Sequence, residues 1–90
     1  MLADGTYLKS NGHFLRIEAT DGYWVAVEET TLSEAQDGEI VGVWNDPDTG
    51  RLWIDKTRFI SDKQTAIITA KAYDQIAIWD NYLQTTITTN

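Results

Sequence analysis

The sequence lacks cysteine, and it has a single histidine, a single proline and a single methionine. Disulfides and thiolate metal sites are therefore excluded, and too few histidines remain for a zinc site. The one histidine, His13, adjoins Asn11-Gly12 and is expected to be an exposed residue beside a turn. No Gly-x-Ser-x-Gly elbow occurs, and a small β-domain rarely has a cleft that desolvates a catalytic carboxyl. We therefore expect no enzyme activity and no cofactor.

Lysine and arginine are absent from residues 17–48, although this stretch holds nine acidic side chains. Two apolar segments, 23–27 and 40–44, run through it, which indicates a folded stretch with one sign of surface charge. The net charge of −7 disfavours direct binding of nucleic acid and of anionic membranes. It favours a basic protein partner, or it serves solubility alone.

The start of the chain has no basic segment followed by an apolar one, so a signal peptide is not predicted. No apolar run approaches the roughly 20 residues that a membrane span needs. We therefore expect a cytoplasmic protein. The hydrophobic fraction of 42% is too high for disorder, and 90 residues leave room for one domain, residues 1–90.

Asn11-Gly12 predicts a type I′ turn between strands 6–10 and 13–17, because both central residues of such a turn have positive φ. A two-residue loop places Leu8 opposite Leu15. The aliphatic side of this hairpin is the expected core face, and the side with Tyr7 is expected to be the mixed outer face.

A second hairpin is predicted between strands 13–17 and 23–28, with Gly22 in the left-handed position of a three-residue loop. This register places Val25 opposite Ile17 and turns Trp24 away from the core. Residues 30–38 are then expected to be a surface loop, in which Thr31 or Ser33 followed by Glu34 could start one helical turn.

A third hairpin is predicted from strands 39–45 and 51–55, with Trp44 opposite Arg51. The aliphatic residues at 41, 43, 52 and 54 then share the core face. The other face carries both Trp44 and Trp53, with Trp53 across from Gly42, where the missing side chain leaves room for a ring.

Residues 46–53 resemble the Asp-box hairpin of sialidase-type β-propellers, which reads Ser-x-Asp-x-Gly-x-Thr-Trp. In this sequence Asp48, Gly50 and Trp53 match that motif, while Asp46 replaces the serine and Leu52 the threonine. The resemblance covers eight residues and implies a turn. It implies nothing about sialidase activity, and no family resemblance covers the whole chain.

Two interpretations of residues 61–83 stay open. A capping-box pattern begins at Ser61, and apolar residues recur at helical spacing up to Leu83. The same region is rich in β-branched residues, and segments 65–69 and 76–79 are typical of strands. We favour strands, because β-branched residues continue through 85–89.

The predicted fold is mainly β: a small antiparallel barrel or sandwich, with an SH3-like barrel as one form. The alternative is an α+β fold in which a helix within residues 61–83 packs on a five-stranded sheet.

Our first functional hypothesis is a small acidic, non-catalytic protein-binding module, an inhibitor or adaptor that acts on a basic partner protein. One specific form is a nucleic-acid mimic. Electrostatic complementarity would raise the association rate, and tryptophan would supply affinity. The candidate partner-binding residues are Glu28, Glu29, Trp44, Asp46, Asp48 and Trp53.

The second hypothesis is a carbohydrate- or small-ligand-binding β-domain. Trp44 and Trp53 would form its stacking platform, and nearby aspartates would bind hydroxyl groups. A third interpretation is a subunit of a homo-oligomer, with tryptophan at the seam between subunits.

Overall fold

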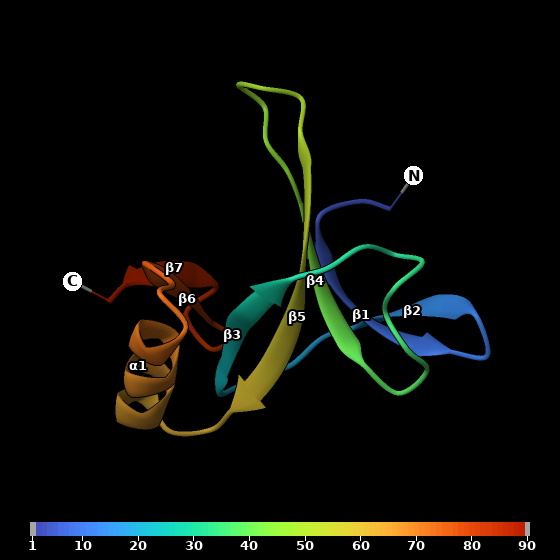
Figure 1. The fold of residues 1–90 in the computed structure, drawn as a ribbon. Coiled ribbons are helices and arrows are strands. Elements are labelled where there is room, and N and C mark those ends of the chain that lie inside the picture. The colour runs from blue at the N-terminus through green and yellow to red at the C-terminus, as the bar shows by residue number, and fades with distance from the viewer. Residues whose placement is uncertain (1, 90) are drawn as a thin grey trace. The chain divides into compact units, whose positions relative to one another are not determined.

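The computed structural model describes residues 2–89, which form a mainly β fold (Figure 1). Within this range the elements are β1 Gly5–Ser10, β2 His13–Ile17, β3 Tyr23–Glu29, β4 Ile40–Asn45, β5 Leu52–Ile60, α1 Lys63–Ala72, β6 Ala77–Asp80 and β7 Thr85–Thr88. The seven strands form one unclosed antiparallel sheet in the order β2-β1-β4-β5-β3-β6-β7. The mainly β prediction is confirmed, whereas the barrel or sandwich form is not.

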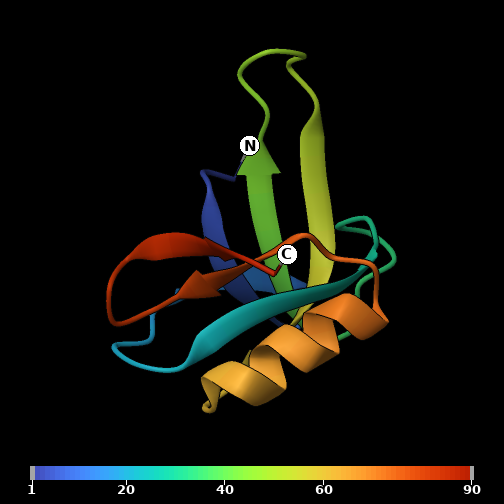
Figure 2. The same ribbon diagram turned by 90° about the vertical axis from the view of Figure 1, so that its left-hand side faces the viewer.

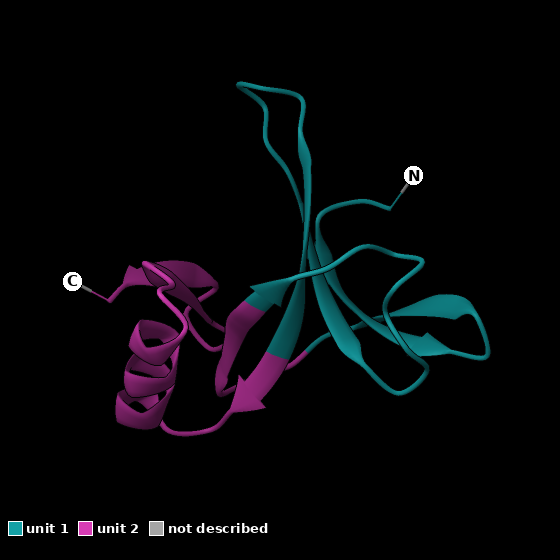
Figure 3. Ribbon diagram, in the orientation of Figure 1, with its two compact units in different colours: residues 1–18, 28–57 teal, residues 19–27, 58–90 magenta. Residues whose placement is uncertain are grey.

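The chain divides into two compact units (Figure 3). Unit 1 consists of residues 1–18 and 28–57, and unit 2 of residues 19–27 and 58–90. Each unit is built from two separate stretches of chain. A single domain over residues 1–90 stays a prediction.

The first hairpin, β1–β2, has the predicted turn and register in unit 1. Asn11 and Gly12 have φ values of 50° and 80°, and Leu8 lies opposite Leu15. The predicted core face was wrong, since Tyr7 is 5% exposed and Leu15 is 53% exposed. The aromatic side chain buries more apolar area, and its hydroxyl donates a hydrogen bond to the Ala3 carbonyl at 2.7 Å.

The prediction of a β2–β3 hairpin was wrong. β2 is an edge strand that pairs with β1, and β1 pairs on its other side with β4. In unit 2, Trp24 of β3 instead lies opposite Trp79 of β6. The alternation of β3 was still correct, because Val25 and Val27 are buried. Alternation fixes which side chains are buried without fixing the partner strand.

The β4–β5 hairpin is displaced by two residues from the predicted register. Trp44 lies opposite Trp53 instead of Arg51, and Gly42 lies opposite Asp55. A shift of two preserves both faces, so Val43 and Ile54 still share the core. The predicted register failed because the connecting turn is tighter than expected: the Asp46 N–H donates to the Arg51 carbonyl and the Gly50 N–H donates to the Asp46 carbonyl, both at 2.8 Å.

The connection between β3 and β4, expected to be a surface loop, contains one turn with a helical hydrogen bond. The Ala35 N–H donates to the Thr31 carbonyl at 3.0 Å. The turn is not wholly superficial, since Ala35 is 3% exposed and belongs to the core cluster of unit 1. Lys9 Nζ donates to the carbonyls of Leu32 and Ala35, which fixes the turn against β1.

In unit 2, residues 63–72 form the helix α1, so the preferred strand over 65–69 was wrong. The strand β6 lies one residue after the predicted strand 76–79, and β7 lies within the β-branched residues 85–89. A cluster of Val25, Ala66, Ala70 and Ile78 forms the core of this unit. Figure 2 shows α1 running beside β3 in this unit. The alanines at positions i and i+4 let the helix approach the strands closely.

Candidate functional site

The candidate site is the sheet face of unit 1 that lies opposite the Val41–Val43–Ile54 core. Successive register pairs place one set of apolar side chains on this face: Leu8, Leu15, Ile17, Ile40, Trp44 and Trp53. We call this set the apolar face. Its side chains are half-buried or exposed, and Trp44 retains 51% of its accessible surface. A tryptophan this exposed on a strand is a candidate anchor for a partner.

The Arg51 guanidinium covers one side of the Trp53 ring. The Arg51 guanidinium carbon lies 3.6 Å from the ring centroid, and Arg51 Nη2 is 3.2 Å from both carboxylate oxygens of Glu29. Trp53 Nε1 is buried without a hydrogen-bond partner among residues 2–89. Glu29, Arg51 and Trp53 therefore form one stacked group on the same face.

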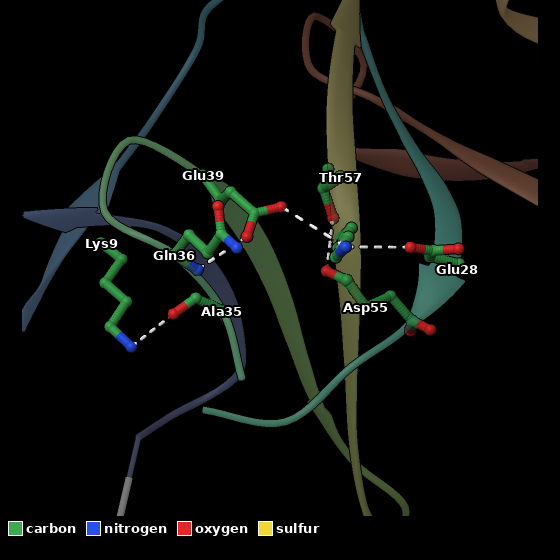
Figure 4. A network of polar contacts seen from close by, with 8 residues as sticks. Lys9, Glu28, Ala35, Gln36, Glu39, Asp55 and Thr57 are labelled. Carbon is green, nitrogen blue, oxygen red and sulfur yellow. Dashed lines mark hydrogen bonds and ion pairs between the residues drawn. The ribbon is translucent and has the colours of Figure 1, made fainter. Parts of the chain in front are cut away.

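Glu28 belongs to a different network, which also contains Glu39 (Figure 4). Lys56 Nζ lies 2.9 Å from Glu28 Oε1 and 3.7 Å from Glu39 Oε2. The hydrogen bond and charge of Glu28, followed by the charge of Glu39, raise the pKa of Lys56. Lys56 lies opposite Val41, on the core side of β5. The structure thus separates Glu28 from the predicted partner-binding tryptophans.

Asp55 is a site residue that the predicted partner-binding set omitted. It lies opposite Gly42, on the same face as Trp44 and Trp53. Partial burial raises the pKa of its carboxyl, and the charge of Glu29 adds to this effect. The alternation of β5 could have placed Asp55 beside Trp53, whereas its proximity to Glu29 needs the tertiary structure.

Asp46 and Asp48 lie in the turn between β4 and β5. Asp46 stabilises the turn, because its Oδ1 accepts the Asp48 N–H at 2.9 Å and its carbonyl accepts the Gly50 N–H at 2.8 Å. Asp48 is exposed. The turn that the Asp-box resemblance implied is present.

The structure distributes the charge unequally between the two units. Unit 1 contains ten acidic and four basic residues, a net charge of −6, whereas unit 2 contains four acidic and three basic residues, a net charge of −1. The apolar face and the six predicted partner-binding residues all belong to unit 1. Its exposed tryptophan is therefore part of a strongly acidic unit.

Several classes of site have no counterpart in the described part of the chain. No group of three His, Cys, Asp or Glu side chains is arranged to hold a metal ion there. Between residues 2 and 89, no helix combines the length and the apolar character needed to cross a membrane.

The chain matches no family model, no curated protein and no solved structure.

Proposed function

We propose that this chain is a small acidic, non-catalytic protein-binding module that acts as an inhibitor or adaptor on a basic partner protein. The observation that carries the proposal is the exposure of Trp44, 51%, on the apolar face of a unit whose net charge is −6. An exposed apolar side chain supplies affinity when a partner covers it and excludes water, and the surrounding acidic residues attract a basic partner.

The predicted acidic residues differ in whether their carboxylates are already paired with a cation of the same chain. Glu28 and Glu29 form ion pairs with Lys56 and Arg51. Among the described residues, neither Asp46 nor Asp48 forms an ion pair. A partner cation could therefore approach Asp48 without displacing an internal one. We assign the leading electrostatic role to Asp46 and Asp48, and a weaker one to Glu28 and Glu29.

The carbohydrate-binding alternative needs two free aromatic surfaces. Trp44 is exposed, but the Arg51 guanidinium covers one side of the Trp53 ring. Stacking of a sugar on Trp53 would require either the opposite side of that ring or displacement of a cation that Glu29 also holds. This arrangement favours protein binding as the primary proposal. A nucleic-acid mimic and a cytoplasmic location remain part of that proposal.

Charge reversal at Asp46 and Asp48 tests the electrostatic half of the proposal. The immobilised chain would be incubated with an extract of its native host at low salt, and retained proteins would be identified after washes of rising salt. A basic protein retained by the wild type should be retained much less by the Asp46→Lys, Asp48→Lys variant. Its release should also depend steeply on salt, because screening weakens attraction between exposed charges.

Two matched comparisons make this result specific. Asp48→Lys alone should weaken capture more than Asp21→Lys, which makes the same charge change at an exposed position of unit 2. Trp44→Ala should weaken capture of the same protein at every salt concentration. Urea denaturation would verify that each variant is folded. Equal capture by wild type and the double variant would overturn the electrostatic role, and glycan screening would then follow.

A further inference from the structure

The strand β7 forms one edge of the sheet, and both of its ends are fixed. At the start, Asp80 Oδ1 accepts the N–H groups of Tyr82 and Leu83 at 2.9 and 3.1 Å. At the far end, the Thr89 N–H and hydroxyl donate to the carbonyls of Ile76 and Gln75 at 2.9 and 3.0 Å. An edge that is already ordered loses little entropy when another strand binds to it.

The open side of β7 presents the backbone groups of Thr86 and Thr88. Ile87 lies opposite Ile78, and the Thr89 N–H bonds to Ile76, so the odd-numbered residues of β7 direct their N–H and C=O groups toward β6. Backbone groups alternate along a strand. Those of Thr86 and Thr88 therefore point away from β6, toward a position that another strand could occupy.

This edge lacks the charged residues and the proline that often block strand addition. Residues 81–89 contain no charged side chain and no proline. The opposite edge of the sheet, β2, carries Arg16, which forms an ion pair with Glu18 at 3.7 Å. Charged residues and proline protect natural edge strands from pairing with other chains. β7 is short, but it has no protection of this kind.

The charge distribution disfavours a basic partner at this edge and makes it the place where a second copy of this chain is least opposed. Two molecules of net charge −7 repel each other, so self-association is least opposed where the surface is neutral. Residues 81–89 are neutral, and they belong to a unit of net charge −1. A basic partner would gain no electrostatic attraction from these residues.

We propose that two copies of this chain form a weak, reversible dimer by antiparallel pairing of their β7 strands. In the symmetric register, Ile87 faces its own copy, and Thr86 of each chain faces Thr88 of the other. The outward backbone groups then form about four hydrogen bonds between the chains. Opposed threonines are a favourable cross-strand pair. The contact uses unit 2 residues alone and is independent of the proposed partner surface.

Sedimentation equilibrium on the full chain, from micromolar to millimolar concentration, tests this dimer. The average mass should rise reversibly toward that of a dimer, and added salt should strengthen the association or leave it unchanged, because salt screens the repulsion. Amide exchange should slow with concentration at Thr86 and Thr88, while Ile87 stays protected at every concentration. A chain that remains monomeric at millimolar concentration would overturn the proposal.

Three substitutions distinguish backbone pairing from other association. Thr86→Pro removes an N–H group that points outward, and an edge strand accepts proline at such a position. This variant should weaken the dimer about tenfold or more. If the proline variant does not fold, Thr86→Lys is the substitute, because its added charge should weaken the dimer as well. Thr86→Val keeps the N–H and should keep the dimer. A dimer that survives both disruptive changes, or that is lost in Thr86→Val, would contradict pairing through the β7 backbone.

Discussion

At the scale of single residues, Gly22 shows how a local signal and a distant contact combine. Its φ of +71° is the left-handed conformation that the Asp21-Gly22 sequence predicted. The structure adds a second constraint, because a Cβ at this position would overlap the ring of Phe59. The Phe59 ring also contacts Trp24, with centroids 5.5 Å apart in an edge-to-face arrangement. The turn conformation follows from neighbouring residues, whereas the aromatic contact depends on the fold.

We expect Gly22→Ala to destabilise the protein more than Gly50→Ala. Both glycines have left-handed backbones, which cost roughly 1–2 kcal/mol for alanine. A Cβ at Gly50 meets no atom within 4 Å, while one at Gly22 must displace Phe59, at a further cost of about 1–3 kcal/mol. Urea denaturation of the two variants gives the comparison. Equal losses would show that Phe59 moves aside freely.

At the scale of elements, α1 and the sheet registers show what sequence patterns determine. Thr65 and the β-branched residues after it favoured a strand, yet the segment is helical. Asp62 begins the helix, because its Oδ2 accepts the Thr65 N–H and hydroxyl, both at 2.8 Å. Burial of Ala66 and Ala70, which lie on one side of the helix, then stabilises the helical conformation. Turn chemistry predicted the β1–β2 register, but the β4–β5 register follows from the hydrogen bonds that close the turn between Asp46 and Arg51, which the sequence pattern did not indicate.

We expect Asp62→Ala to lower the urea midpoint and Asp62→Asn to preserve most of the stability, since asparagine is also a good N-cap. The backbone and side-chain hydrogen bonds from Thr65 lower the pKa of Asp62 below its ordinary 3.8. The stabilisation is therefore present above pH 3.8 and is lost as pH falls through the lowered pKa.

Circular dichroism during urea titrations across this pH range measures both effects. If the wild type has a higher urea midpoint than Asp62→Asn, this difference should disappear once Asp62 is protonated. An advantage that persists at the lowest pH would mean that Asp62 contributes through something other than its ionised carboxylate.

At the scale of the whole molecule, the chain passes between its two units three times, after residues 18, 27 and 57. Neither unit is a continuous segment, so neither can be isolated by cutting the chain once. The sequence showed an acidic block over residues 17–48, but it did not show that 19–27 belong to another unit. Nor could it show that Lys56 and Arg51 pair with Glu28 and Glu29, since those contacts depend on the fold.

We expect one cooperative unfolding transition, because β3 and β5 each contribute residues to both units. Each unit contains two tryptophans, which makes a direct test practicable. Replacing Trp44 and Trp53 by Phe leaves fluorescence from unit 2, and replacing Trp24 and Trp79 leaves fluorescence from unit 1. In each variant the fluorescence and circular dichroism midpoints should coincide. Separate midpoints would show two independently unfolding units and contradict the single-domain prediction.

The pairing of Trp24 with Trp79 has a consequence for biosynthesis. These residues are about 55 positions apart, so at roughly 5–20 residues per second the ribosome needs about 3 to 11 s to add the partner of β3. During that interval Val25, which is fully buried in the finished protein, lacks β6, and for most of it Val25 also lacks the completed helix α1. Unit 2 therefore completes its core only after β6 has been synthesised, and chains interrupted before that point would expose an apolar strand.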